Sequence, residues 1–240
     1  MQIDRPEANN TINGLLVDEC NEVLAVCEES ATIVVLSGSP EVFCFGADFK
    51  ALARPSTTRA SEHRDDPGLL YECWLRMATG PYITISHVRG KANAGGIGFV
   101  AASDIVLADD TAQFSLSELL FGLVPACVMP FLIRRIGFQK ANYMTLMTRP
   151  IAVQQAHAWG LVDAFETESD ALLRRHLLRL RRVSKTAIRR YKAYVNGLTT
   201  SLRELKVPAV AANLEVFSDA DNLEGIVRYV EHGVFPWEKP

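Results

Sequence analysis

The stretch of sequence that decides the fold is YITISHVRGKANAGGIGFVAASDIVLAD, residues 82–109. It begins with an apolar, β-branched run (82–88), continues through small residues (90–99) and ends in a second apolar run (104–109). Apolar runs of this kind are typical of strands buried on both faces. Because a helix over the small residues would connect them, the stretch predicts a strand–helix–strand unit of an α/β protein.

The same alternation extends over the first 165 residues. ATIVVLSG (31–38) predicts another buried strand, and a helix capped by Asn10 or Thr11 is expected to run to about Glu29. The polar segment 53–68, with two prolines, predicts a surface loop. From about Ser169 the pattern is helical, so we expect an α/β core over 1–168 and a helical region over 169–240.

Composition excludes several classes of protein. The 240 residues are 48% hydrophobic and carry a net charge of -3, which gives no global attraction to nucleic acid or an anionic membrane. No apolar run approaches the roughly 18 residues of a membrane span. The five cysteines show no C-x-x-C spacing, so neither a metal site nor a disulfide framework is expected. These features predict a cytoplasmic protein.

One basic segment stands apart from this average. Residues 174–192, RRHLLRLRRVSKTAIRRYK, contain nine lysines or arginines and no acid. Such a run is either a solvated helix face or a docking surface for an acidic partner. Arg181 and Arg182 are the candidates for docking.

Two glycine-containing segments are candidates for anion binding. FCFGADF (43–49) and GKANAGGIGF (90–99) expose backbone with little side-chain cover, the second at the entry to a helix. Amide N–H groups at such a junction lack intrahelical partners and attract an anionic oxygen. A Gly-Gly pair entering a helix is, by itself, more often a device for tight packing. If the amides of Ala47 and Gly95 face one point, they form an oxyanion hole.

A third segment supplies an acid. In AQFSLSELLFGLVP (112–125), Glu118 is surrounded in sequence by leucines and phenylalanine. Apolar surroundings disfavour the charged carboxylate, so Glu118 is a candidate acid or base near neutral pH. The alternative is a helix-capping glutamate or one half of an ion pair.

Together these motifs resemble those of the enoyl-CoA hydratase/isomerase (crotonase) superfamily. FCFGADF is similar to its F-x-x-G-A-D segment, VRGKANAGG (88–96) to V-x-G-x-A-x-G-G, and AQFSLSELLFGLVP to A-x-F-x-x-P-E-x-x-x-G-x-x-P, with Ser117 at the proline. The match extends to RPEANNTIN (5–13) near the start and to AVQQAHAWGLVD (152–163) and FSDADNLEGIVRYVE (217–231) near the end. The resemblance implies a spiral of ββα repeats and a C-terminal helical trimerisation region. It implies oxyanion amides at Ala47 and Gly95 and a catalytic carboxyl at Glu118.

One departure from the family's motifs reduces the number of possible reaction mechanisms. The first catalytic glutamate of two-carboxylate hydratases would fall at Gly98, which has no side chain. Single-carboxylate chemistry is therefore favoured.

Most of the hairpin expected ahead of RPEANN (5–10) is also missing, either because the start is truncated or because this member dispenses with it.

A closer resemblance is to the dehydratases of polyketide β-branching cassettes, carried by FCFGADF, TISHVRGKANAGG, SLSELLFGLVPACV and GVFPWE. Those enzymes convert a 3-hydroxy-3-methylglutaryl group on an acyl carrier protein to 3-methylglutaconyl; the decarboxylases that follow them lack a glutamate at the Glu118 position. The resemblance implies a homotrimer or hexamer, a phosphopantetheine-linked substrate and no cofactor.

The substrate's distal carboxylate needs a cationic or hydrogen-bonding partner. Candidates near the oxyanion segment are His87, Lys91 and Asn93, although a histidine in an apolar strand is more often a satisfied core residue. Two other functions stay open. One is an enoyl-CoA isomerase or hydratase acting on free CoA thioesters, and the other is a non-catalytic scaffold or RNA-binding homologue.

Overall fold

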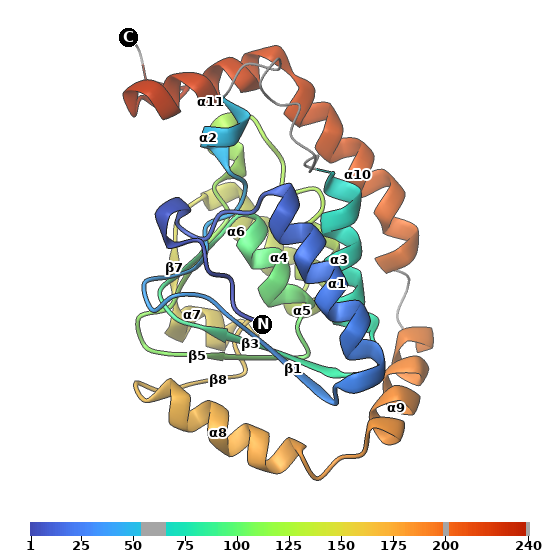
Figure 1. Cartoon of the computed structure of the whole chain (residues 1–240). Helices are drawn as coiled ribbons and strands as arrows, with labels where there is room; N and C mark the ends of the chain where they lie inside the picture. The colour runs from blue at the N-terminus through green and yellow to red at the C-terminus, as the bar shows by residue number, and fades with distance from the viewer. Residues whose placement is uncertain (54–65, 199–201, 239–240) are drawn as a thin grey trace.

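The strands fall alternately into two sheets. In the computed structural model, which describes residues 1–53, 66–198 and 202–238, one sheet has the order β1–β3–β5–β8 and the other β2–β4–β6–β7 (Figure 1). Neighbouring strands are parallel except for β6 and β7. The bounds are β1 (Ile33–Ser37), β2 (Val42–Cys44), β3 (Ile83–Val88), β4 (Lys91–Asn93), β5 (Ile105–Ala108), β6 (Gln113–Ser115), β7 (Ile151–Ala152) and β8 (Ala164–Phe165). From β1 to β6 the chain changes sheet after every strand, as in the spiral that the resemblance to crotonases implies.

Helices surround these sheets, and every described element from Ser169 onward is a helix. The first part contains η1 (Pro6–Ala8), α1 (Gly14–Ser30), α2 (Phe49–Leu52), α3 (Pro67–Thr79), α4 (Gly95–Ala102), η3 (Glu118–Phe121), α5 (Met129–Ile136), α6 (Phe138–Met147) and α7 (Val153–Ala158). The C-terminal part contains α8 (Ser169–Leu180), α9 (Lys185–Leu198), α10 (Leu202–Ser218) and α11 (Ala220–His232). The predicted α/β core followed by helices is confirmed.

The predicted start of α1 is wrong by a few residues. The helix begins after Asn13, whose side chain accepts a hydrogen bond from the Leu16 amide at 3.0 Å. Asn10 does not cap it, because its backbone is left-handed, with φ 53°, and its side chain donates to the Val42 carbonyl at 2.7 Å. The better cap lies closer to the apolar residues that repeat at helical spacing.

Two other expectations need correction. Most of the predicted loop over 53–68 lies outside the described residues, but Pro67 and Gly68 begin α3, with the Asp66 side chain as its cap. The segment after Gly90 is not helical at once, because β4 precedes α4. A strand of three residues is too short to leave a clear pattern in the sequence.

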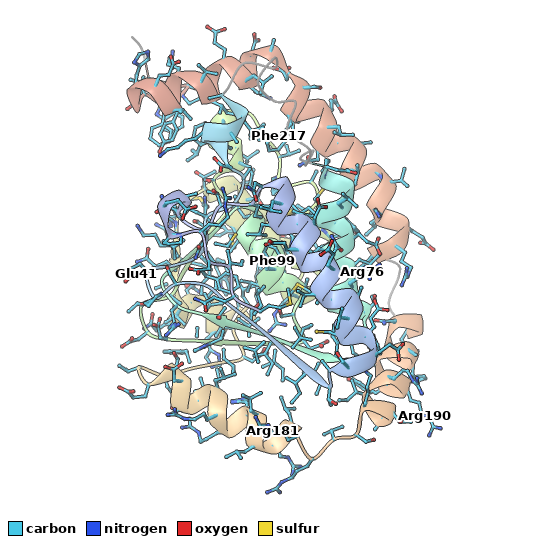
Figure 2. All side chains as sticks on the ribbon, viewed as in Figure 1. Glu41, Arg76, Phe99, Arg181, Arg190 and Phe217 are labelled. Atoms are coloured by element: carbon cyan, nitrogen blue, oxygen red, sulfur yellow. The ribbon has the colours of Figure 1, made fainter. Side chains whose placement is uncertain are left out.

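The apolar core lies between the sheets and α1, α3, α4 and α5, with Phe99 near its centre (Figure 2). Helix α8 covers the outer face of the β1–β3–β5–β8 sheet, where Leu172 packs against Ile85 and Leu107. Both faces of this sheet are therefore buried, which explains its continuous apolar strands.

The basic segment 174–192 is not uniformly solvated. Lys192 is buried, and its Nζ lies 2.7 Å from Asp104 Oδ2 and 3.0 Å from the Tyr82 carbonyl oxygen. Burial lowers the pKa of Lys192, and Asp104 opposes this shift. In contrast, Arg181 and Arg190 project from the lower edge of the molecule (Figure 2). The solvated-face interpretation is therefore wrong for Lys192, which fixes α9 to the core.

All five cysteines are free thiols. The described ranges contain no cluster of three metal-ligating side chains and no helix long and apolar enough to cross a membrane.

Candidate active site

The two glycine-containing segments are in close backbone contact at Gly46 and Gly95. Gly46 has a φ of +86°, and a Cβ atom there would lie 2.6 Å from the Cβ of Ala94 and 3.2 Å from the Gly95 nitrogen. Only glycine accommodates both this backbone conformation and this close approach. The structure thus brings together the Ala47 and Gly95 segments that the sequence proposed for the oxyanion hole.

The N-terminal segment braces the Ala47 loop. The Ile12 amide donates to the Gly46 carbonyl at 2.7 Å, and the Asp48 amide donates to the Ile12 carbonyl at 3.2 Å. Arg5 forms an ion pair with Asp48 at 3.2 Å. These contacts hold the backbone on both sides of Ala47, whose own amide donates no hydrogen bond within the described part of the chain.

The Gly95 amide is presented by a strained residue. Ala94 precedes α4 with φ 50° and ψ -122°, a backbone conformation that costs free energy for any residue with a Cβ. Its amide is fixed by a 3.0 Å hydrogen bond to the Ser115 carbonyl. Gly95 is the first residue of α4, and its N–H has no partner among the described residues. Two unpaired amides on touching segments are the arrangement that an anionic oxygen requires.

Glu118 belongs to the same site, because its segment contacts both of the others. The Asn93 side-chain amide donates to Ser117 Oγ at 2.9 Å, which links the entry of α4 to the residue before Glu118. Phe49, on α2, packs edge to face against Phe121, with ring centroids 4.9 Å apart. Each of the three segments thus contacts the other two.

The environment of Glu118 changes its acidity. Its side chain is buried, and its Oε2 atom has no hydrogen-bond partner in the described structure. Burial raises the pKa of Glu118 to about 7, because the carboxylate loses its hydration, although hydrogen bonds from its own amide and that of Ser117 oppose the shift. A carboxyl with this pKa can accept and release a proton near neutrality. The alternative of an ion-paired glutamate has no support, because no charged group contributes to the shift.

The C-terminal region covers the turn that holds Glu118. Phe121 contacts the rings of Tyr229 and Phe235, at centroid distances of 5.1 and 5.7 Å. The Asn222 side chain, on α11, donates to the Gly122 carbonyl at 3.2 Å. Figure 1 shows α11 beside α2 at one end of the molecule. The helical region therefore helps to keep this side of the site apolar, a role that the sequence did not reveal.

The position of the family's first catalytic glutamate is filled by another side chain. A Cβ atom at Gly98 would lie 2.3 to 2.6 Å from three atoms of the Trp74 ring. Trp74 comes from α3 and is buried. No side chain fits at position 98 while Trp74 stays in place. The sequence shows that position 98 has no carboxylate, but it does not reveal that Trp74 occupies this space.

The three candidates for binding the distal carboxylate are not brought together. His87 is buried beneath α8, and its Nε2 lies 2.9 Å from Ser169 Oγ, which is the placement of a satisfied core histidine. Burial lowers its pKa. Asn93 uses its side chain to connect Ser115 and Ser117, at 2.8 and 2.9 Å. Lys91 is exposed at the start of β4, and its role stays a prediction.

The docking candidates lie far from Glu118 within one chain. Arg181 and Arg182 are exposed after the end of α8. Phe217 packs against the cluster that contains Phe121. Figure 2 shows Arg181 and Phe217 at opposite ends of the molecule. A carrier that docks at Arg181 would therefore approach from the end away from this Glu118.

The chain is similar to known proteins over its whole length. The family model for enoyl-CoA hydratase/isomerase matches residues 1–240. A protein of Bacillus subtilis named bacillaene synthase dehydratase PksH is 60% identical over 235 residues, covering 98% of this chain and 90% of that protein.

The chain is also similar to solved structures of such proteins. The crystal structure of a putative polyketide biosynthesis enoyl-CoA hydratase from B. subtilis has a TM-score of 0.93 and 58% identity, covering 98% of this chain and 94% of that one. An enoyl-CoA hydratase from Bacillus halodurans has a TM-score of 0.83 at 21% identity, covering 93% and 94%, and so matches in fold.

The contact between Gly98 and Trp74 predicts the sign of a stability change. Replacing Gly98 by Ala should lower the free energy of unfolding by about 1–3 kcal/mol, because the added methyl group overpacks against the indole. Gly197, on α9, has no atom within 4 Å of a Cβ position, so Gly197→Ala should raise stability by up to about 1 kcal/mol. Denaturant unfolding of both variants checks this. Equal stabilisation would mean that Trp74 does not occupy the position.

Proposed function

The chain belongs to the enoyl-CoA hydratase/isomerase family, and on that premise we propose that it removes water from a 3-hydroxyacyl thioester in polyketide biosynthesis. The substrate is 3-hydroxy-3-methylglutaryl on the phosphopantetheine arm of an acyl carrier protein, and the product is 3-methylglutaconyl. The observation that carries the proposal is a buried carboxyl, Glu118, on a segment that contacts both segments with unpaired backbone amides, and the lack of a second carboxylate at Gly98. The name of the B. subtilis relative, a dehydratase, supports the same reaction.

The amides of Ala47 and Gly95 act on the thioester carbonyl. When the C2 proton leaves, negative charge develops on the carbonyl oxygen, and both N–H groups donate to it. One such donor lowers the barrier by about 3–4 kcal/mol in other enzymes. Because these amides are fixed by the contacts of Gly46 and Ala94, little reorganisation is needed as the charge forms.

Glu118 moves both protons. Its carboxylate takes the proton from C2, and the resulting carboxylic acid then protonates the departing 3-hydroxyl group. A pKa of about 7 suits both steps, because neither form of the carboxyl is strongly favoured at neutral pH. One residue can thus complete a cycle that two-carboxylate hydratases divide between two.

The substrate's chemistry sets the remaining requirements. No cofactor enters the reaction, because proton transfer and an oxyanion hole suffice. The distal carboxylate of the substrate needs a cationic or hydrogen-bonding partner, and the exposed Lys91 stays a candidate. Assembly into trimers or pairs of trimers remains a prediction from the family.

A lone glutamate also suits double-bond migration in a free CoA thioester, which is the second candidate function. Relative turnover of carrier-bound and CoA-bound substrates separates the two. A non-catalytic scaffold would gain nothing from a buried carboxyl whose Oε2 atom has no partner among the described residues and whose charged form is disfavoured by burial. Such a scaffold is therefore disfavoured, as is an RNA-binding role for a segment in which Lys192 serves the core.

Mass spectrometry of the carrier-bound substrate tests the proposal. The wild-type protein should convert 3-hydroxy-3-methylglutaryl carrier to a product lighter by one water, with no loss of carbon dioxide. Glu118→Gln keeps the volume but cannot transfer the proton, so turnover should fall by about 10² to 10⁴-fold with the fold intact. Loss of carbon dioxide, or near-normal turnover by Glu118→Gln, would contradict the proposal.

Charge reversal tests whether the basic segment binds the carrier. The double change Arg181→Glu and Arg182→Glu should lower kcat/KM for the carrier-bound substrate by about tenfold at low ionic strength, with a smaller loss at high salt because screening masks the charges. A short pantetheine thioester should be turned over unchanged.

The matched control reverses two exposed arginines outside the segment, Arg149→Glu and Arg203→Glu, and so changes the net charge equally. Equal losses in both double variants would assign the effect to net charge. No loss in either would leave Arg181 and Arg182 as part of a solvated face, as their distance from Glu118 within one chain allows.

A further inference from the structure

The indole N–H of Trp74 is buried and has no hydrogen-bond partner among the described residues. The side chain is 1% exposed, so water does not satisfy the group. Buried tryptophan N–H groups normally find an acceptor, and an orphan requires an explanation. Glu118 Oε2, the acceptor of the proposed proton transfer, is unpaired in the same way.

The Trp74 ring lies against the first turn of α4, at an edge that includes the carbon bonded to Nε1. The ring atoms nearest to a Cβ at Gly98 include Cζ2 and Cε2, at 2.3 and 2.5 Å, and Cζ2 is also 4.0 Å from a Cβ at Gly95. Nε1 is bonded to Cε2, so it belongs to the same edge of the indole. The ring also packs edge to face against Phe99 and Phe131, at centroid distances of 5.8 and 5.9 Å.

The spacing of Gly95 and Gly98 along α4 indicates how far the Trp74 ring lies from the proposed position of the substrate carbonyl. Gly95 and Gly98 are three residues apart, so they share one face of the helix, with Cβ positions about 5–6 Å apart. If the thioester carbonyl oxygen lies at the Gly95 amide, C3 of the acyl chain is two bonds from the carbonyl carbon. The 3-hydroxyl oxygen is three bonds from the carbonyl carbon and the distal carboxylate carbon is four, so the hydroxyl group lies closer along the chain to the oxyanion amides.

We propose that Trp74 donates its Nε1–H to the 3-hydroxyl oxygen of the substrate and thereby positions the leaving group; this rests on the proposed dehydration. In that reaction Glu118 takes the C2 proton, and the C–H electron pair forms the C2–C3 double bond. The C3–O bond breaks with its pair on oxygen, and Glu118 returns the proton to give water. The indole keeps its own proton and stabilises the charge that develops on the oxygen.

The bicyclic ring fills the Gly98 position, which the single ring of phenylalanine would leave partly empty. Its N–H is buried without a partner among the described residues, which costs free energy unless an acceptor binds there. The indole adds one N–H at the position that hydratases of this family give to a carboxylate. It can donate a hydrogen bond to an oxygen but does not exchange a proton with it, so proton transfer to the leaving group is left to Glu118.

The first test is spectroscopic and uses Glu118→Gln, which holds substrate without turnover. The indole Nε1–H signal of Trp74, assigned by its loss in Trp74→Phe, should shift downfield on saturation with the 3-hydroxy-3-methylglutaryl pantetheine thioester. The 3-methylglutaryl thioester, which keeps the distal carboxylate and lacks the hydroxyl group, should leave it in place. The Trp159 signal is the internal control. A shift with both ligands, or with neither, would overturn the assignment.

The second test distinguishes the effect of the N–H donor from the effect of the ring's shape. Benzothienylalanine placed at position 74 keeps the bicyclic ring and replaces N–H by sulfur. Exchange of the C2 proton with deuterated solvent, which needs only the oxyanion hole and Glu118, should stay within about threefold of wild type. Release of water should fall by at least about tenfold in kcat, the effect of one lost hydrogen bond to a charged group, with KM within about threefold.

Trp159→Phe, a change at a partly exposed tryptophan on the end of α7, should alter neither rate. Equal falls in exchange and water release would make Trp74 a merely structural residue and overturn the inference, as would full activity of the benzothienylalanine variant. A different result would refute the proposed function itself. If the wild-type protein exchanges the C2 proton but never releases water, it is not a dehydratase, whatever the variants do.

Discussion

The site depends on one constraint, the burial of the Glu118 carboxyl among apolar side chains. Keeping the carboxylate form there is unfavourable, and the rise in pKa to about 7 corresponds to roughly 3 kcal/mol of destabilisation of that form. The folded state at higher pH is therefore less stable than it would be with an ordinary carboxyl, since folding favours the protonated acid. Packing around Phe121 by the C-terminal helices offsets this cost, which links the helical region to the chemistry of the core.

The oxyanion segments depend on a second constraint, the contact of Gly46 with Gly95. A close backbone approach leaves no room for side chains, and the strained Ala94 is held by its hydrogen bond to Ser115. Strain of this kind persists where surrounding contacts determine the conformation. Asn93 extends the same network to the turn of Glu118. The amides and the carboxyl are thus positioned by one connected set of contacts.

Much of this could be predicted from the sequence, because the signals are local. The strands at β1, β3 and β5 are continuous apolar runs, and Gly46, Gly95 and Glu118 lie in recognisable motifs. The remainder depends on contacts between distant segments. Pairing of Trp74 with Gly98, of His87 with Ser169 and of Lys192 with Asp104 leaves no local pattern. The short strand β4 is missed for the same reason, since pairing rather than propensity forms it.

The most direct test of the account is the titration of Glu118 itself. Carbon-13 NMR of protein labelled at glutamate carboxyl groups, with the signal assigned by Glu118→Gln, follows this one group as pH changes. The account predicts a midpoint near 7, because burial disfavours the carboxylate and no cation compensates. A midpoint near 4.5, the ordinary value for glutamate, would mean that Glu118 is solvated or paired, and would contradict its role as both base and acid.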